Sequence, residues 1–433
     1  MAYPNSSTDR ESAGIDLRDN AIGILFLLLT VAVCLLRLFV PSNLMNLVMF
    51  YTEEGGPFYQ KLHVGTYALV ALTFVVLSTR RLALSDKDAL LLRSVLRYGA
   101  VISTFVLYFA ITGRLSAIGF IVETYLSAVL VAVLLLALNE QSRRMVATTV
   151  LFVLVVSAVI GLGEVILRHR LLPFDKDILV QRATGLTDHP LSLGAQCVVA
   201  ISFVPLVRWP LWIKIASILI LLLGCVSANA RSALAASCLE ILLLILIMPW
   251  PNLTPGRAWR AKAITLFATL LLGVLFITAL LSLGFLSRFD SVVDSSSLAR
   301  VQIYEIFHYV SWKDILLGMD GAELARIVKE KVGLDYIESA PVFFIMLMGL
   351  PMAIAFTVIV IGFIQRLLRG APIPAKIGAT VFLIVDLTNN ALATKTADMM
   401  LLAILVIGMR NSLRTAPASR TMQPAREVTH AYR

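Results

Sequence analysis

The chain has 433 residues, of which 59% are hydrophobic and only 15% are charged. Soluble domains carry about 45–50% apolar and about 25% charged residues, so this composition excludes an ordinary soluble protein and predicts a polytopic membrane protein. The net charge of +10 does not indicate a nucleic-acid partner. Cytoplasmic loops of membrane proteins collect Lys and Arg, and the chain has no recognisable nucleic-acid motif.

The apolar runs predict an all-α fold of about twelve membrane-spanning helices, since each span needs roughly 20 apolar residues. The predicted spans are 21–40, 62–79, 94–112, 116–138, 146–167, 191–207, 211–227, 232–249, 262–286, 340–365, 376–393 and 397–410. The last two are short for a bilayer. The segment 43–58 is apolar at first but breaks at Glu53 to Pro57, which is typical of an interfacial or re-entrant piece.

The spans divide the chain into tails, membrane helices and one large polar insertion. The parts are a tail (1–20), spans one to nine (21–286), the insertion (287–339), spans ten to twelve (340–410) and a second tail (411–433). Basic residues gather in the loops on the side of the tails, so the positive-inside rule predicts that both termini are cytoplasmic. The insertion then lies on the outer side. It is compatible with amphipathic helices, and loops this long usually carry function.

Three arginines on the outer side are candidates for binding an anionic ligand: Arg182, Arg231 and Arg300. Arg presents a planar fork of donors that matches phosphate oxygens, and it keeps its charge at every relevant pH. Ser and Asn residues before Arg231 and Arg300 are typical helix N-caps, and helix N-termini favour anions. Alternatively, each Arg snorkels to the interface or pairs with a loop carboxylate. Three together favour a phosphate-bearing substrate.

Candidate acid or base groups on the same side are Glu338, His308 and His189. Glu338 stands where the insertion meets the tenth span, and partial loss of hydration there suits a general base. The alternative is an interfacial Glu paired with a cation such as Lys331. His308 falls about two helical turns after Arg300, so both would share one side of a helix. The alternatives are a His packed in an apolar core and, for His189, a plain loop residue.

Four carboxylates lie within predicted spans: Glu123, Glu164, Glu240 and Asp386. A charge at the bilayer centre costs about 2.5–3.5 kcal/mol on insertion scales, so each needs a partner or a cavity. The functional interpretation is a proton or ion pathway, and the structural one is interior pairing with groups such as Arg97. We favour the structural one for all except Glu164, which is nearest the outer face and is expected to line the same cavity as Arg182.

The four cysteines lie inside apolar runs, at a spacing that matches no metal site. No metal, phosphate-loop or dinucleotide motif appears in the chain. The sequence therefore predicts no disulfide framework, no metal and no cofactor.

The order of these features resembles the bacterial O-antigen polymerase and O-antigen ligase superfamily. The similar segments are Arg182–Gly185 with His189-Pro190 and Leu193-Gly194, the turn Ala230-Arg231-Ser232, the run Arg300, Trp312 and Ile315–Gly318, and Ile337–Ser339 through Gly349-Leu350. They fall within residues 150–410, and their order and common side of the membrane carry the resemblance. Glu338 stands where the ligases show a His. The chain is therefore most similar to exopolysaccharide repeat-unit polymerases, including those of the xanthan type.

The resemblance implies a GT-C-like glycosyltransferase of the bacterial inner (cytoplasmic) membrane. Such an enzyme transfers a glycan from undecaprenyl diphosphate to a sugar hydroxyl of a second lipid-linked repeat unit, without a metal. The implied partners are the undecaprenyl-diphosphate-linked oligosaccharide, membrane lipid, and a chain-length regulator and flippase of the same pathway. Alternatives that stay open are a ligase, a transporter or flippase for lipid-linked sugars, and a non-catalytic scaffold.

The resemblance also assigns roles to the candidate residues. Arg182, Arg231 and Arg300 would hold the diphosphate and stabilise the charge that develops on it. Glu338 would accept the proton of the attacking hydroxyl, with His308 or His189 as substitutes. The expected substrate site also includes His189 and Glu164.

Overall fold

The structure is a computed structural model, and it describes residues 6–51, 57–80, 82, 84–172, 182–249, 254–282, 295–334 and 337–411. Within these ranges the chain forms helices and turns and contains no β-strand. The beginning of the predicted insertion and most of the second tail lie outside the described residues.

The helices before residue 250 follow the apolar runs of the sequence. They are α1 (Ser6–Phe39), α2 (Ser42–Asn46), η1 (Phe58–Lys61), α3 (Val64–Thr79), α4 (Asp86–Ile111), α5 (Leu115–Phe120), the π-helix η2 (Ile121–Leu126), α6 (Ser127–Ala137), α7 (Glu140–Leu167), α8 (Pro190–Phe203), η4 (Val204–Leu206), α9 (Leu211–Ser227) and α10 (Arg231–Ile247). Several begin at a polar cap. The Asn139 side chain accepts the Ser142 N–H at 2.8 Å before α7, which satisfies an amide that the first turn leaves without a partner.

After residue 250 come one long helix, the folded insertion and a C-terminal group. They are α11 (Pro255–Ser282), α12 (Ser295–Gln302), η6 (Ile303–His308), α13 (Trp312–Leu317), α14 (Gly321–Ile327), the π-helix η7 (Val328–Val332), α15 (Ala340–Met348), α16 (Leu350–Leu367), α17 (Ile373–Thr388), η8 (Ala391–Ala393) and α18 (Asp398–Met409). Ser311 and Asp314 form a capping box at the start of α13. This reciprocal pair of hydrogen bonds fixes the helix start inside the insertion.

Six of the described helices are long and apolar enough to cross a membrane. They are Asn20–Phe39, Asp86–Ile111, Ala117–Ala137, Glu140–Leu167, Gly256–Leu275 and Leu350–Leu367. Shorter apolar helices run over Val64–Thr79, Pro190–Leu206, Leu211–Ser227 and Asp398–Met409. The protein is thus an all-α membrane protein, which confirms the class predicted from composition, while the count of about twelve spans stays a prediction.

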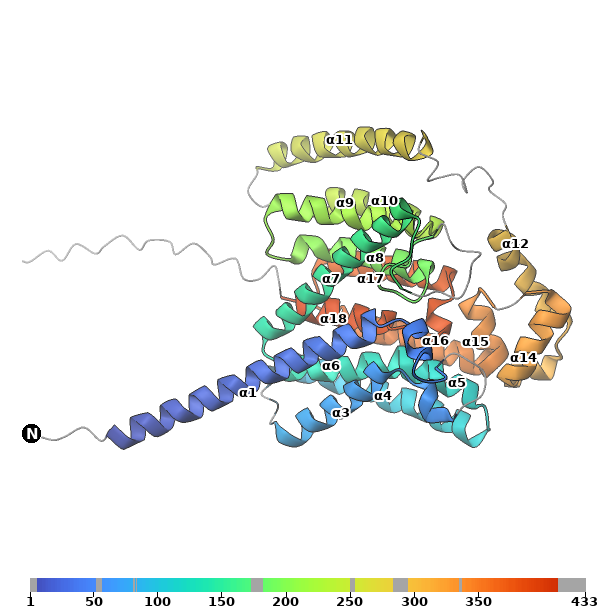
Figure 1. The fold of residues 1–433 in the computed structure, drawn as a ribbon, viewed down its shortest axis with the longest axis horizontal. Coiled ribbons are helices and arrows are strands. Elements are labelled where there is room, and N and C mark those ends of the chain that lie inside the picture. Colours follow the sequence, from blue (N-terminus) through green and yellow to red (C-terminus); the bar gives the residue numbers. More distant parts are fainter. Residues whose placement is uncertain are drawn as a thin grey trace, which may run out of the picture.

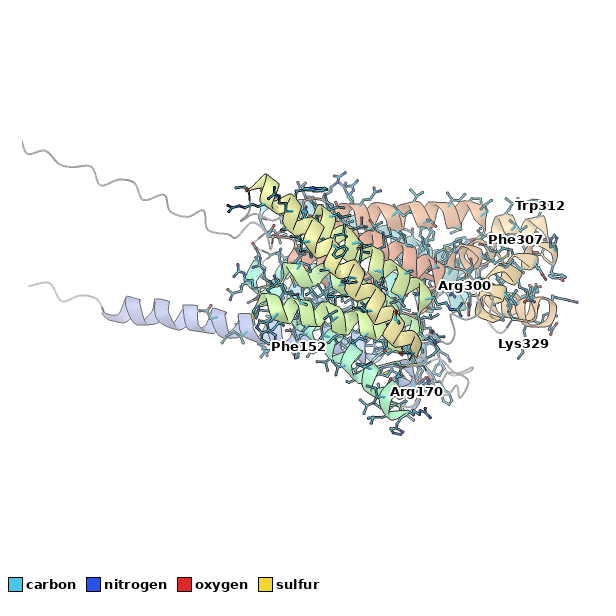
Figure 2. The ribbon with its side chains drawn as sticks, turned by 90° about the horizontal axis from the view of Figure 1, so that it is seen from above. Phe152, Arg170, Arg300, Phe307, Trp312 and Lys329 are labelled. Atoms are coloured by element: carbon cyan, nitrogen blue, oxygen red, sulfur yellow. The ribbon has the colours of Figure 1, made fainter. Side chains whose placement is uncertain are left out.

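The helices pack as a bundle in which the connections alternate between two ends (Figure 1). α18 lies inside it: all of its residues are buried, and it packs against α6 and α7. α12 to α14 gather at the end where α7 finishes and α10 begins (Figures 1 and 2). α11 packs along α10, and no residue of its apolar segment Gly256–Leu275 is buried. The loops predicted to face outward therefore share one end of the bundle.

The insertion has a small apolar core of its own. Its buried members are Ile303, Ile306, Ile315, Met319, Leu324, Val328, Val332 and Ile337, joined by Val342 and Met346 of α15. Burial of aliphatic side chains stabilises such a unit by about 25 cal/mol for each Å² removed from water. The insertion is thus a folded cap seated on α15.

The predicted span 340–365 is wrong as a single helix, because the helix breaks at Gly349 into α15 and α16. Gly349 has a φ of +85°, and Gly318, at the end of α13, has a φ of +75°. The backbones of the two glycines approach closely, and a Cβ on Gly318 would lie 2.6 Å from the carbonyl oxygen of Leu347. Glycine alone tolerates both the left-handed φ and the close approach. The break is therefore where the insertion meets the bundle.

Arg114, in the turn between α4 and α5, fastens this junction. Its Nη1 donates to the carbonyl oxygens of Leu317 and Leu347, both at 3.1 Å, and its Nη2 donates to that of Gly318 at 3.0 Å. A helix end and a helix break both leave carbonyls without intrahelical partners. The Arg114 guanidinium donates hydrogen bonds to three of these carbonyls through its fork of N–H groups.

Candidate functional site

Glu164, near the end of α7, organises the loop that carries Arg182. The side chain is 6% exposed. Its Oε2 accepts the N–H groups of Thr184 (2.9 Å) and Gly185 (3.0 Å), and its Oε1 accepts the N–H of Leu171 at 3.1 Å. Three backbone amides of the loop thus share one side chain as their acceptor. Sequence reasoning expected Glu164 to line a ligand cavity, and the structure engages both of its oxygens in folding the loop.

The loop turns sharply at Gly185, where φ is +55°. A Cβ there would lie 2.8 Å from the hydroxyl of Ser157 in α7, and the same hydroxyl accepts the N–H of Leu186 at 3.0 Å. The segment from Thr184 to Leu186 is thus pressed against α7. The Arg182–Gly185 motif noted in the sequence has a clear structural basis in this turn.

The loop also joins the turn that carries Arg231. The Nε of Arg182 donates to the carbonyl oxygen of Ala228 at 3.0 Å, and the N–H of Ala183 donates to that of Ser227 at 3.0 Å. Arg231 is the first residue of α10, three positions further on. Both arginines are half-buried. The structure therefore brings together two segments that are about 45 residues apart in the chain, as a site built from both requires.

The predicted N-cap for Arg231 is wrong. Ala230 occupies the cap position and makes no side-chain hydrogen bond, while the Ser227 hydroxyl donates to the carbonyl of Gly224 at 3.0 Å, inside α9. Asn229 instead takes the left-handed conformation, with a φ of +50°. Arg231 still begins a helix, where the backbone N–H groups favour an anion.

His189 is the N-cap of α8. Its Nδ1 accepts the N–H of Leu191 at 3.1 Å, so the ring uses one nitrogen as an acceptor. The hydroxyl of Thr187 donates to the carbonyl oxygen of His189 at 3.1 Å. His189 thus fixes the end of the loop from Arg182 as the N-cap of α8.

Arg300 and Glu338 face each other across the insertion. The Arg300 Nε lies 3.5 Å from the Glu338 Oε2, with side chains 35% and 15% exposed. That separation makes an ion pair and not a hydrogen bond, and the buried Nε has no hydrogen-bond acceptor among the described residues. Glu338 directly precedes the Ser339 cap of α15. The carboxylate is thus paired with Arg300 instead of Lys331, the partner considered from the sequence.

Two expectations for the insertion are wrong. Arg300 lies in the last turn of α12 and not near its N-terminus, because the helix ends at Gln302. The chain then continues as the 3₁₀ helix η6, so Arg300 and His308 do not share one side of a regular helix. His308 is exposed at the end of η6 and makes no hydrogen bond or ion pair with a residue that the structure describes.

The two arginine groups share one end of the bundle. Arg170, whose Nη2 donates to the Arg182 carbonyl oxygen at 3.2 Å, lies at the same end as Arg300 (Figure 2). The described contacts join Arg182 to the turn before Arg231 and Arg300 to Glu338. The candidate site therefore consists of two parts: the loop and turn with Arg182, His189 and Arg231, and the cap with Arg300 and Glu338.

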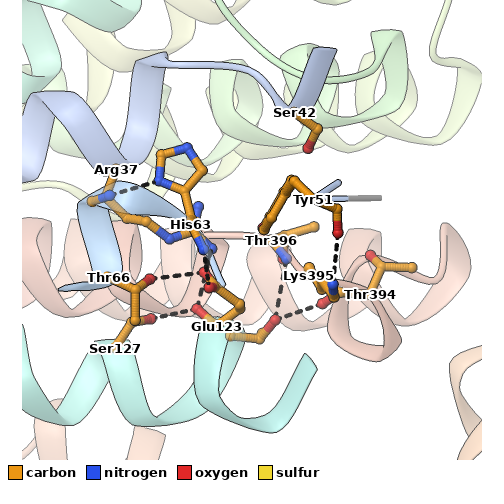
Figure 3. A network of polar contacts seen from close by, with 12 residues as sticks. Arg37, Ser42, Tyr51, His63, Thr66, Glu123, Ser127, Thr394, Lys395 and Thr396 are labelled. Carbon is orange, nitrogen blue, oxygen red and sulfur yellow. Dashed lines mark hydrogen bonds and ion pairs between the residues drawn. The ribbon is translucent and has the colours of Figure 1, made fainter. Parts of the chain in front are cut away.

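A buried ion pair between Arg37 and Glu123 lies near Asp188, a residue of the loop in the first part. The Arg37 Nη2 lies 2.8 Å from the Glu123 Oε2, and the side chains are 3% and 0% exposed. Glu123 also accepts the His63 N–H at 2.6 Å and the Thr66 hydroxyl at 2.8 Å (Figure 3). A buried carboxylate needs such partners. The pairing agrees with the structural interpretation of Glu123, with Arg37 as the cation in place of Arg97.

Lys395 extends this network toward the outer connections. Its Nζ donates to the carbonyl oxygens of Tyr51 at 3.2 Å and Lys61 at 2.9 Å (Figure 3), and it lies 4.8 Å from the centre of the Tyr51 ring. Burial lowers the pKa of Lys395, against the opposing effect of Glu123. The Asp188 carboxylate accepts the N–H of Ser42, the first residue of α2. The loop from Arg182 to His189 thus contacts the start of α2.

Sequence reasoning missed Arg37 and Lys395 as network residues. The sequence feature that could have identified them is a basic side chain close to the end of an apolar run. A charge at that depth in the membrane needs a partner. The other buried carboxylates differ from Glu123. Glu240 accepts the Ser202 hydroxyl, whereas neither oxygen of Asp386 has a hydrogen-bond partner among the described residues.

Fold and polar sites together define an all-α membrane protein with a folded, helical cap at one end. Among the described residues, no group of three or more His, Cys, Asp or Glu side chains could hold a metal ion. A comparison with protein-family models finds no match, and a comparison with the sequences of curated proteins finds none either.

Proposed function

We propose that the protein is a membrane glycosyltransferase that polymerises undecaprenyl-diphosphate-linked oligosaccharide repeat units of an exopolysaccharide on the outer face of the bacterial inner membrane. The observation that carries the proposal is the Arg300–Glu338 pair, which joins the start and the close of the cap. It lies at the end of the bundle that also holds the Arg182 loop and the Arg231 turn. An acid–base group paired with one arginine, at the same end of the bundle as two others, suits transfer from a diphosphate.

The three arginines would bind the diphosphate of the donor. Arg300 has a buried Nε without a hydrogen-bond acceptor, and a phosphate oxygen would supply one. Arg182 and Arg231 are held on adjacent segments by the hydrogen bonds to Ala228 and Ser227. Since charge grows on the diphosphate as its bond to the sugar breaks, preorganised guanidinium groups stabilise the transition state more than the ground state.

Glu338 would act as the general base. When the diphosphate engages Arg300, the attraction between Arg300 and Glu338 weakens, and the Glu338 carboxylate turns toward the hydroxyl of the second repeat unit. The hydroxyl oxygen forms a bond to the anomeric carbon of the growing glycan, and the bond from that carbon to the phosphate oxygen breaks. The proton passes to Glu338, and undecaprenyl diphosphate leaves. A diphosphate is a good leaving group, so the proposal needs no metal.

The finer features of the membrane arrangement belong to the same proposal. They are the spans beyond the six long helices, a GT-C-like arrangement, and cytoplasmic termini with the cap in the periplasm. The proposed partners are the lipid-linked repeat unit and a chain-length regulator and flippase of the same pathway. Support comes from the shared end of the predicted outer loops (Figure 1) and from the basic residues of the other loops.

The test is chain growth by the full-length protein in lipid nanodiscs, supplied only with lipid-linked repeat units. We expect polymer without nucleotide sugar or ATP, and no polymer from Arg300→Ala or Glu338→Gln. The matched controls are Arg326→Ala and Glu330→Gln. These residues form an exposed ion pair on the same cap, 3.9 Å apart, and exposed pairs contribute little to stability. Normal polymer from both site variants would refute the assignment.

Two alternatives are separated by an added acceptor in the nanodisc assay and by a transport assay in vesicles. A ligase would transfer the glycan only when a different acceptor, such as a lipid A core, is added. A proton-coupled transporter is favoured by Asp386, whose carboxylate is buried without hydrogen-bond partners among the described residues. Transport would appear as movement of the lipid-linked unit across a vesicle membrane, lost in Asp386→Asn and unaffected in Glu338→Gln.

A further inference from the structure

A groove runs between α4 and α16 on the outside of the bundle, with a volume of about 210 Å³. Its lining divides into two chemical zones. One is polar, with Ser94 and Arg97 of α4 opposite Arg366 of α16. The other is apolar and includes Ile359 and Phe363. Arg366 lies in the last turn of α16, so the groove is at the end of α16 away from the cap.

The polar zone carries two positive charges without an acidic neighbour. The Arg366 Nη1 reaches the Ser94 hydroxyl at 3.5 Å, and Arg97 makes no hydrogen bond or ion pair with a residue that the structure describes. No carboxylate lines the groove. Two guanidinium groups on opposite walls match the oxygens of a phosphate, which each Arg binds through its fork of donors.

The apolar zone continues the groove along the helices. The Tyr98 and Phe363 rings stack with centroids 3.9 Å apart at 10° and join the two walls. Gly362 leaves space beside them, because a Cβ there would meet nothing within 4 Å. Val101, 36% exposed, extends the apolar wall. An inorganic anion would make no favourable contact with this apolar zone, whereas an acyl chain would pack against it.

We propose that this groove binds an anionic phospholipid, with its headgroup phosphate between Arg97 and Arg366 and an acyl chain over Gly362 and Phe363. The proposal does not depend on the glycosyltransferase activity. Basic residues at this end predict that it faces the cytoplasmic leaflet, whose anionic lipids attract juxtamembrane arginines. A lipid wedged between α4 and α16 would stabilise their packing.

The test is native mass spectrometry of the full-length protein in neutral detergent, with added dioleoyl phosphatidylglycerol or dioleoyl phosphatidylcholine. We expect tighter binding of phosphatidylglycerol. Each arginine near an anionic headgroup contributes about fivefold in affinity, so Arg97→Gln with Arg366→Gln should weaken binding about 25-fold. Replacing both with Lys should weaken binding less than Gln does, because the charge remains although the fork of donors is lost. Gly362→Phe should also weaken it, because the ring fills the apolar zone while both charges remain.

The matched control is Arg93→Gln with Arg369→Gln, which removes the same charge from exposed positions next to the groove but outside its lining. We expect this variant to bind phosphatidylglycerol as the wild type does. Equal binding of the two lipids, wild-type affinity in the groove variant, or equal losses in both double variants would overturn the proposal. Displacement of phosphatidylglycerol by an equal concentration of inorganic phosphate would also overturn it, because the site would then recognise a simple anion.

Discussion

Glu164→Ala should release the loop that carries Arg182 from α7. The carboxylate is 6% exposed and accepts the N–H groups of Leu171, Thr184 and Gly185 at 3.1, 2.9 and 3.0 Å. A hydrogen bond to a charged group contributes about 1.5–3 kcal/mol. Loss of that amount raises the opening equilibrium of each amide by about 10- to 150-fold. Hydrogen exchange at the Thr184 and Gly185 amides should accelerate by the same factor.

The assay is hydrogen–deuterium exchange of the full-length protein, read from peptides that cover residues 182–193. The matched control is Glu140→Ala in the first turn of the same helix. Glu140 is 51% exposed and lies 3.8 Å from Arg144, and exposed pairs contribute about 0–1 kcal/mol, so exchange should stay as in the wild type. Unchanged exchange in Glu164→Ala would refute the anchor role and favour the ligand role expected from the sequence.

Two further predictions concern residues that hold the bundle and its cap together. Arg114→Ala leaves three carbonyls at the cap junction without a donor, so trypsin should cleave faster at Lys329 in the cap, and an unchanged cleavage rate would contradict the fastening role. Glu123→Ala leaves Arg37 buried without its carboxylate and should cost about 3–5 kcal/mol in thermal or chemical unfolding. Arg37→Met combined with Glu123→Leu should recover part of that loss, and a double variant less stable than Glu123→Ala would contradict the argument.

Hydrophobic runs were enough to predict the helices of the bundle, because a span must satisfy its backbone internally and expose apolar side chains. They did not predict the break at Gly349. The local signal was Pro351, the second residue of α16, because a proline cannot donate to the carbonyl four residues before it and so does not continue the helix from α15. The approach of Gly318 from the cap accounts for the conformation of the turn. The end of α12 before η6 was not predicted either, since its residues are compatible with both an α-helix and a 3₁₀ helix.

The candidate site shows the same limit more clearly. The sequence identified Arg182, Arg231, Arg300 and Glu338 from their chemistry and side of the membrane, but it did not reveal their partners. Glu338 pairs with Arg300 across 38 positions of the chain. Pattern reasoning works on neighbours three or four residues apart, whereas these pairs depend on how separate helices pack.

The position of Glu338 also depends on the membrane helices, and that dependence can be tested. The Nδ2 of Asn390, between α17 and η8, donates to the carbonyl oxygen of Ile337, the residue before Glu338. Asn390 has a φ of +66°, a conformation that costs a residue such as Ala about 1–2 kcal/mol. Asn390→Gly therefore removes the hydrogen bond without adding strain, and Asn390→Ala removes it and adds strain.

If the proposed polymerase is correct, both Asn390 variants should lower kcat for chain growth and leave KM for the lipid-linked donor close to the wild-type value, because the arginines that would bind the diphosphate are untouched. Asn389→Ala is the matched control. The Asn389 Oδ1 accepts the Ala391 N–H at 3.2 Å within the same turn, so this variant disturbs the turn without removing the contact to Ile337. A wild-type kcat in Asn390→Gly would show that the hydrogen bond does not position the base. The strain in Asn390→Ala would then be the sole cause of any loss in that variant.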